Sequence, residues 1–360
     1  MQVIYDDVPF NKQLVTLARE SRGISQIELA KALGLSQGKM SKIENGLLGL
    51  SRDELNNIAQ FLEYPVSFFQ RDEKVHGVGL SEFYHRKRQS VPQKSLNKIY
   101  ANLEARRMEI AQLLKSIDLG EPDFHYMDPD RFNDDVPRIA ATIRAAWHIP
   151  KGPIQNVVEV IENAGGIIVP FDYEGVNIDA ITMFHPNTPP LIFTNFERPM
   201  DRIRFTLCHE LGHIIMHRKP PGEDTDIEQQ ADTFAAEFLM PGDEISSSLG
   251  ELSLKKLASL KLYWRVSMSA LLVRATTLGK VNAGQSRYLW EELSKRGYKK
   301  REPEELTPPK ETPNMLDEIL KLHHEDLGYS ISDLSQTLHL NELEYKKMYS
   351  SQPSHLRLVK

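Results

Sequence analysis

The chain has 360 residues, enough for roughly two or three domains of ordinary size. Its formal net charge of −6 gives no whole-chain sign of nucleic-acid binding, so any basic surface must be local. A single cysteine, Cys208, rules out an internal disulfide framework and fits a reducing compartment. The N-terminus lacks a basic-then-apolar signal and no apolar run could span a bilayer, so we expect a cytoplasmic protein without a membrane segment.

Between residues 11 and 69, apolar residues recur at helical spacing and are interrupted at short intervals. Ser25, Ser36 and Ser51 are suited to cap three of the helices, and Glu28 stands at the capping-box position of the first. Five short helices in this stretch, with a tight turn between the second and third, predict a helix-turn-helix domain.

The segment SQIELAKALGLSQGKMSKIENG closely resembles the Cro/C1-type (Xre family) DNA-binding domains. It has Gln opening the second helix, Ala in mid-helix, Gly at the turn and Glu-x-Gly after the recognition helix. The resemblance implies binding to double-stranded DNA as a homodimer, whereas a module reused for protein contacts is the alternative. Gly38 departs from the pattern because it offers no side chain where many relatives place a contact residue. The residues that the resemblance places at the DNA are Gln26, at a phosphate, and Gln37, Lys39, Ser41 and Lys42, towards the major groove.

A basic run with helical spacing follows at residues 84–107, and it includes Arg86, Lys87, Arg88 and Arg107. A solvated helix face is the default interpretation of such a run, and a phosphate-contacting extension of the DNA module is the alternative. Beyond it the chain turns acidic and holds several prolines, which predicts a domain boundary.

The middle of the chain changes character, because short β-rich runs follow two amphipathic helices and precede a third. An edge strand in such an arrangement can pair with an extended peptide substrate. The first two helices are expected at 135–148 and 154–164, the strands at 167–171, 180–184 and 191–194, and the third helix after Met200.

This third helix carries the pattern HELGH. His209 and His213 are one turn apart on one helix face, so two imidazoles can converge on one metal ion. Glu210 lies beside that face, where its carboxylate can take a proton from a water activated by the metal. The metzincin class is excluded, because Met216 and Lys219 stand where its continuation requires Gly and His.

Zinc catalysis needs three protein ligands and one open position. Downstream, EQQADTFAAEFLMP holds Glu228 and Asp232 four residues apart on one predicted helix, and a turn at 220–222 allows that helix to fold back. Glu228 could bind the metal while Asp232 orients a ligand imidazole. Glu237, on the same helix, is the rival third ligand. The sequence thus predicts a Zn²⁺ site with two His ligands and one Glu.

HELGH followed by E-x-x-A-x-x-F-A-A-x-x-L-M-P resembles the signature of the ImmA/IrrE family of metallopeptidases, over roughly residues 139–241. The resemblance implies a core similar to the zincins. Members of that family are associated with cleaving or otherwise antagonising repressors. Carried over to this chain, the ligands are His209, His213 and Glu228, and the general base is Glu210.

The C-terminal part is expected to be helical. Residues 252–278 have helical spacing, and the piece WRVSMSALLVRATTLG (264–279) resembles the helix-turn-helix-like tail often found after this peptidase core. A charged, proline-rich linker is expected at 299–313. Residues 316–349 have the rhythm of a degenerate helix-turn-helix without an obvious basic recognition face, which favours a role in protein contacts.

The expected fold is multidomain and mainly α, with a five-helix N-terminal domain and an α+β zincin-like core. The expected function is that of a transcriptional regulator whose zinc endopeptidase domain acts on a repressor, a toxin or another partner protein. The alternative is a transcription factor or antitoxin whose zinc domain senses a signal or binds a partner without turnover. The expected domains are 1–73 (DNA binding), 74–130 (basic connector and linker), 131–247 (peptidase core), 248–300 (helical tail) and 312–352 (small helical unit).

Overall fold

A computed structural model of the chain describes residues 8–76, 91–185, 188–219 and 225–349. The chain divides into two compact units. The first unit contains residues 1–118 and 317–360, and the second contains residues 119–316. The first unit is therefore discontinuous in sequence, because the C-terminal residues return to the N-terminal part.

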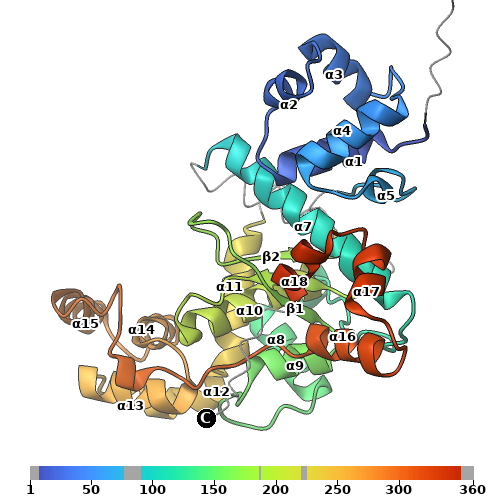
Figure 1. Cartoon of the computed structure of the whole chain (residues 1–360). Coiled ribbons are helices and arrows are strands. Elements are labelled where there is room, and N and C mark those ends of the chain that lie inside the picture. The colour runs from blue at the N-terminus through green and yellow to red at the C-terminus, as the bar shows by residue number, and fades with distance from the viewer. Residues whose placement is uncertain (1–7, 77–90, 186–187, 220–224, 350–360) are drawn as a thin grey trace, which may run out of the picture. The chain divides into compact units, whose positions relative to one another are not determined.

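The N-terminal part of the first unit consists of short helices (Figure 1), and their buried apolar side chains form one core. Ser25 and Ser51 each form a capping box, with Glu28 and Glu54 respectively, so the starts of two helices follow from local side-chain chemistry. Gly34, at φ +66°, makes the turn between the second and third helices. The helices are α1 (Lys12–Ser21), α2 (Gln26–Ala32), α3 (Gln37–Glu44), α4 (Arg52–Leu62) and α5 (Val66–Phe69).

A long helix, α7 (Gln93–Leu114), packs against α1 and covers part of the same core. The basic run expected here is only partly a solvated face. Arg107 is buried and forms an ion pair with Glu104 at 2.8 Å, because Ala105 and Met108 beside it draw the helix into the core. The expected contributions of Arg86, Lys87 and Arg88 lie outside the described residues.

The C-terminal helices belong to this first unit and contact its N-terminal part through several side chains. Their apolar residues Leu334, Leu338 and Tyr345 are buried. The helices are α16 (Met315–Glu325), α17 (Ile331–Thr337) and α18 (Glu342–Tyr349).

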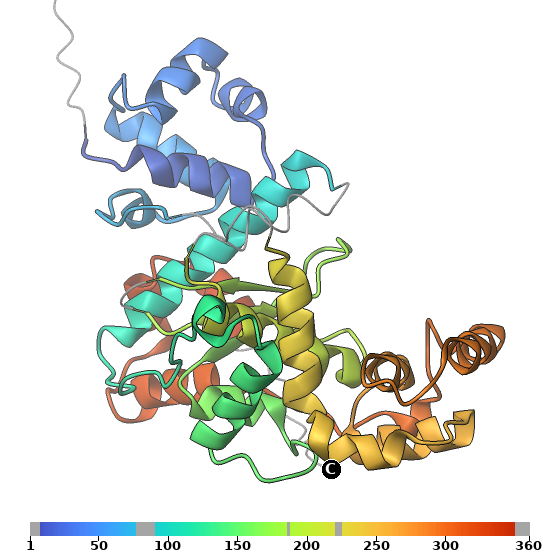
Figure 2. The ribbon, with the colours of Figure 1, turned by 180° about the vertical axis from the view of Figure 1, so that it is seen from behind.

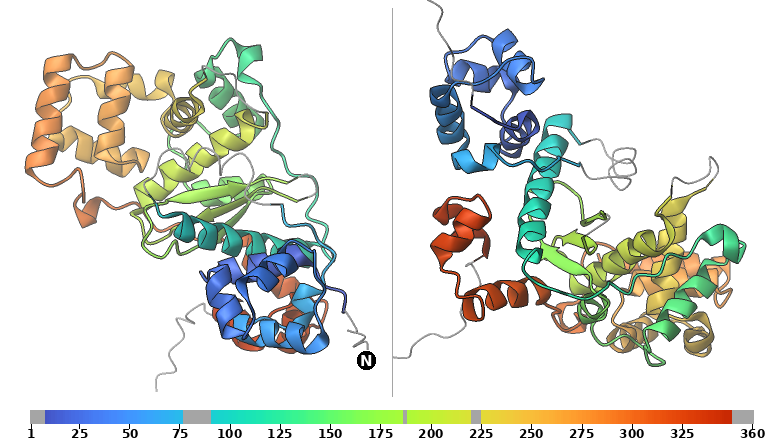
Figure 3. Two further views of the ribbon diagram at one scale, coloured as in Figure 1. Left: turned by 90° about the horizontal axis from the view of Figure 1, so that it is seen from above. Right: turned by 90° about the vertical axis from the view of Figure 1, so that its right-hand side faces the viewer.

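The second unit is built on a small sheet, which is seen from two sides in Figure 3. The sheet has three strands in the order β1-β3-β2. β1 (Ile167–Pro170) runs parallel to β3 (Leu191–Thr194), and β2 (Ala180–Met183) runs antiparallel to it. Every residue of β2 and β3 is buried, in keeping with their nearly continuous apolar sequences. β2 pairs with β3 alone among the described strands, so it is an edge strand.

Helices of this unit pack on the face of the sheet that carries Ile168, Ala180 and Ile192, and their apolar side chains form one large core with these residues. Helix α9, which was expected to start at residue 154, begins at Val157. The Asn156 side chain caps its first turn by accepting a hydrogen bond from the backbone amide of Glu159 at 3.1 Å. The helices are α8 (Val136–Ala146), α9 (Val157–Asn163), α10 (Met200–Met216), α11 (Ile227–Leu239), α12 (Gly242–Ile245), α13 (Leu254–Trp264), α14 (Met268–Thr277) and α15 (Ala283–Lys295), and the 3₁₀ turns are η1 (Pro129–Phe132), η2 (Ser246–Leu249) and η3 (Glu304–Leu306).

The segment expected as a linker, 299–313, is anchored to this second unit. The buried carboxylate of Glu311 accepts hydrogen bonds from the amides of Val157 and Val158, at 2.8 and 3.2 Å, and forms an ion pair with Arg204. A carboxylate at the start of α9 is stabilised by the unpaired amides of the first helical turn. In the part of the chain that the structure describes, each helix is too short or too polar to cross a membrane.

Candidate metal centre and DNA-binding face

The HELGH pattern lies in α10, which runs side by side with α11 (Figures 1 and 2). Gly212 allows this close approach, since a Cβ atom there would lie 3.2 Å from the Cα of Ala231 and 3.3 Å from the Cβ of Phe234. The glycine of the motif therefore has a packing role. Cys208, buried beside it in the core, behaves as a small apolar residue, and burial raises the pKa of its thiol.

Three side chains converge between these two helices. The Nε2 atoms of His209 and His213 are 3.1 Å apart, and each lies 3.6 Å from an oxygen of the Glu228 carboxylate. Zinc binds His nitrogen and carboxylate oxygen at about 2.0–2.2 Å, so a tetrahedral site places neighbouring ligand atoms about 3.3–3.5 Å apart. The donor set and its spacing therefore fit Zn²⁺. Among the described residues, these three are the group of His, Cys, Asp and Glu side chains able to hold a metal ion.

The imidazole of His209 is oriented from its other side. Asp232 places a carboxylate oxygen 2.8 Å from the Nδ1 of His209. Burial lowers the pKa of His209, but the hydrogen bond from Asp232 and the nearby carboxylates of Glu210 and Glu228 outweigh it, so the pKa is raised overall. A carboxylate at Nδ1 keeps the proton on that nitrogen and leaves Nε2 free to bind a cation.

The imidazole of His213 has a partner one helical turn further along α10, His217, which the sequence favours as a helix-end or substrate-side residue rather than as a ligand. The Nδ1 of His217 lies 2.8 Å from the Nδ1 of His213, and the Nε2 of His217 lies 2.9 Å from Oε1 of Gln230. Burial lowers the pKa of His217 to about 4, so this imidazole is neutral at physiological pH. The signal in the sequence is the four-residue spacing from His213 to His217, which repeats the spacing from His209 to His213.

Glu210 points to the sheet. Its Oε2 accepts a hydrogen bond from the hydroxyl of Thr182 on β2 at 2.6 Å, and both side chains are buried. Thr182 was missed in the sequence, where its only signal was one polar residue in the apolar run AITMF. The pairing joins the residue expected as general base to the edge strand of the sheet.

The rival third ligand is engaged elsewhere. Glu237 forms an ion pair with Arg274, and its Oε1 accepts from the amide of Gly242 at 2.9 Å. Because this carboxylate already binds the first amide of α12 and a buried guanidinium, it is not available to a metal ion between α10 and α11. The structure thus brings Glu228, and not Glu237, to the two histidines.

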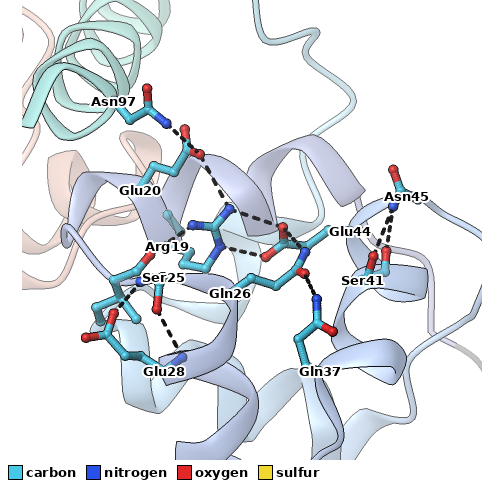
Figure 4. A network of polar contacts seen from close by, with 12 residues as sticks. Arg19, Glu20, Ser25, Gln26, Glu28, Gln37, Ser41, Glu44, Asn45 and Asn97 are labelled. Atoms are coloured by element: carbon cyan, nitrogen blue, oxygen red, sulfur yellow. Dashed lines mark hydrogen bonds and ion pairs between the residues drawn. The ribbon is translucent and has the colours of Figure 1, made fainter. Parts of the chain in front are cut away.

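The expected DNA-binding residues lie on the first unit, where a polar network joins α1, α2 and α3 (Figure 4). Arg19, which is buried, binds both carboxylate oxygens of Glu44 at 2.7 and 3.1 Å. The amide of Gln26 donates to Glu44 at 3.0 Å, and the amide of Gln37 donates to the Gln26 oxygen at 2.9 Å. Gln26 thereby orients Gln37 as well as lying at the start of α2.

The remaining expected contact residues differ in their surroundings. Lys39 is half-buried and forms an ion pair with Glu54, the capping-box residue of α4. Ser41 accepts a long contact from the Asn45 amide at 3.4 Å, and Lys42 is exposed. The ion pair between Lys39 and Glu54 must break before Lys39 can contact DNA. Lys42 is exposed and can contact a phosphate directly.

Two segments of the chain match known domain families. Residues 16–69 match the family model described as helix-turn-helix, and residues 168–276 match the one described as the IrrE N-terminal-like domain. An uncharacterized HTH-type transcriptional regulator of Sinorhizobium medicae is 37% identical over 65 residues, or 18% of this chain and 47% of that protein. A regulator of the same description from Rhizobium meliloti matches with the same identity and coverage. The chain thus spans about half the length of these relatives, and both resemblances found in the sequence are confirmed.

Proposed function

We propose that this chain, which joins a helix-turn-helix DNA-binding domain to an IrrE N-terminal-like domain, is a cytoplasmic transcriptional regulator with zinc-dependent endopeptidase activity. The observation that carries the proposal is the convergence of His209, His213 and Glu228 at distances that fit Zn²⁺. Bound zinc supplies a Lewis acid that activates water and polarises a peptide carbonyl.

The roles of the protein side chains follow from their positions. The two histidines and Glu228 would hold the ion, and Asp232 would fix the ring of His209 through its Nδ1. Glu210 would accept the proton of the attacking water and pass it to the leaving amine. The edge strand β2, which carries Thr182, would pair with an extended substrate segment next to Glu210.

The substrate that we propose is a repressor or another partner protein, and the DNA-binding domain favours this over general digestion. A helix-turn-helix domain concentrates the peptidase at chosen DNA sites, so proteins bound nearby meet it at high effective concentration. Binding to operator DNA as a homodimer is part of this proposal.

The test is co-expression with candidate repressors, in which wild-type protein is compared with the Glu210→Gln variant. We expect the wild type to cleave one candidate and the variant to bind zinc normally without cleaving it. Metal analysis of the purified proteins gives the zinc content in both cases. A purified protein that neither contains zinc nor takes it up would overturn the metal site.

A second candidate function is a regulator whose zinc domain senses a signal or binds a partner without turnover. The burial of Glu210, which is 2% exposed and already held by Thr182, favours it. Under this function Glu210→Gln would retain both zinc and full regulatory activity, which separates the two candidates.

A further inference from the structure

The last two helices repeat the backbone pattern of the recognition motif at the other end of the chain. α17 has 7 residues and α18 has 8, as α2 and α3 have. Ser330 forms a capping box with Asp333 at the start of α17, as Ser25 does with Glu28 at the start of α2. The two pairs of helices therefore begin with the same local chemistry.

The turns inside the two pairs also agree. His339, at φ +55°, takes the left-handed position that Gly34 takes at φ +66°. The amide of Leu340 then donates back to Ser335 at 2.9 Å, as the amide of Leu35 donates to Ala30 at 2.9 Å. α17 and α18 thus form a second helix-turn-helix-like pair, 305 residues after the first in this register.

The charges at the start of α18 are opposed to DNA binding. In the same register, Glu342 and Glu344 of α18 stand where Gln37 and Lys39 stand in α3. Carboxylates at the start of a recognition helix repel the phosphates of DNA. The start of α18 is therefore unsuited to contact a nucleic acid.

Glu344 contacts the DNA-binding domain instead. Its carboxylate binds Arg22 through two hydrogen bonds, at 2.8 and 3.1 Å. Arg22 also donates to the carbonyl of Leu62 at 2.8 Å, and its guanidinium lies 4.5 Å from the ring centre of Tyr64. The Arg22 guanidinium is thus already fixed at the end of α4. It therefore loses little conformational freedom when it binds the Glu344 carboxylate.

A second contact lies at the end of α18. The hydroxyl of Tyr349 donates to the buried carboxylate of Glu109 on α7 at 2.7 Å, and the Arg106 guanidinium lies 3.9 Å from the Tyr349 ring centre. The amide of Asn341, just before α18, donates to the carbonyl of Glu63 at 2.9 Å. Both ends of α18 are therefore attached to the N-terminal part of the unit.

We propose that the C-terminal helices are a helix-turn-helix fold converted into a docking module, and that its partner is the DNA-binding domain of the same chain. Residues 119–316, which hold the zinc site, lie in sequence between the two docked segments. The zinc-site unit is then joined to the DNA-binding domain twice, once through the peptide chain near Asp118 and once through this contact. A single cut in the peptide connection would leave the peptidase attached.

The test uses the full chain with a recognition site for a specific protease inserted between Gly120 and Glu121, both of which are exposed. After cutting, the two fragments are expected to co-elute in gel filtration at micromolar concentration. Their dissociation constant is measured by titrating a labelled N-terminal fragment with the other fragment.

Glu344→Arg should weaken the association by at least about tenfold, because it leaves a partly buried guanidinium facing a like charge. Glu344→Gln, which keeps the shape, should weaken it less. The matched control is Glu342→Arg, since Glu342 pairs with Lys346 on the exposed side of the same helix and should change the constant by less than about threefold.

Circular dichroism of the uncut variants verifies that the helices are retained. Fragments that separate in the wild type would overturn the proposal, as would association that Glu344→Arg leaves unchanged. Equal weakening by Glu342→Arg and Glu344→Arg would overturn the assigned contact. The outcome does not depend on zinc or on proteolysis, so it is separate from the proposed function.

Discussion

Asp232 holds the Nδ1 of His209 at 2.8 Å while the Nε2 of the same ring faces His213 and Glu228. One imidazole thus joins a carboxylate on α11 to a metal-binding position between the helices. Because both carboxylates belong to α11, the geometry of the centre depends on how this helix packs against α10.

Replacing Asp232 by Asn should weaken zinc binding by about 10- to 100-fold, since a neutral amide no longer stabilises the ligand tautomer of His209. Competition with a chromophoric chelator measures the change. The control is Asp226→Asn, which alters the cap of the same helix and should leave zinc affinity within about threefold. Equal affinities of Asp232→Asn and wild type would show that Asp232 does not support the ligand.

Glu228→Gln should lower zinc affinity, whereas Glu237→Gln should lower the stability of the fold. The first removes a ligand and should lower zinc affinity by more than about 100-fold while leaving the apoprotein folded. The second breaks a buried ion pair with Arg274 and should retain zinc but lose about 2–4 kcal/mol of stability. Zinc analysis and urea unfolding separate these outcomes, and loss of zinc in Glu237→Gln alone would reverse the ligand assignment.

Thr182→Val removes the donor to Glu210 at nearly constant volume. Under the proposed endopeptidase activity, cleavage of the substrate should fall by about tenfold or more, because a buried carboxylate loses a hydrogen bond that fixes its direction. Zinc affinity should hold within about threefold, and Thr182→Ser should restore cleavage. A Ser variant as slow as the Val variant would point to packing rather than to the hydroxyl.

On the DNA-binding face, Lys42→Ala should weaken binding to all sequences and reduce the slope of log affinity against log salt by about one. Gln37→Ala should instead relax discrimination at one base pair, by about 1–3 kcal/mol. Selection from a randomised DNA library supplies the operator, and fluorescence anisotropy at several salt concentrations gives the slopes. Lys31→Ala, on α2, is the control lysine, and a slope that falls equally there would contradict the assigned face.

The stability of the docked C-terminal helices should depend on pH through His339. Burial, together with the nearby Arg71, lowers the pKa of His339 to about 4, below the ordinary value of 6.5. As the pH falls from about 6.5 to about 4, His339 is protonated in the unfolded chain before it is protonated in the folded chain. The contribution of neutral His339 to the stability of the fold is therefore complete above about pH 6.5 and is lost as the pH falls towards 4.

His339→Asn should remove this part of the pH dependence, because Asn tolerates the left-handed backbone and does not titrate. Thermal unfolding between pH 7.5 and 5 should show a smaller decrease in midpoint for the variant than for the wild type. Parallel curves for the two proteins would show that His339 does not titrate in this way.

The sequence alone was sufficient wherever structure follows from neighbours a few residues apart. The capping boxes at Ser25 and Ser51 and the one-turn spacing of His209 and His213 are local features, so the helices of the first domain and the face of α10 could be predicted. The Glu228–Asp232 spacing likewise placed two carboxylates on one side of α11, which left only the packing of the two helices to be decided.

The rest required the tertiary structure, because it depends on partners far apart in the chain. Nothing local in AITMF pairs Thr182 with Glu210, 28 residues away, and nothing local shows that the rival carboxylate Glu237 pairs with Arg274. The contact between Arg22 and Glu344 spans 322 residues. The positions of these polar and charged residues follow no periodicity, so their partners are fixed only when the apolar cores bring the elements together.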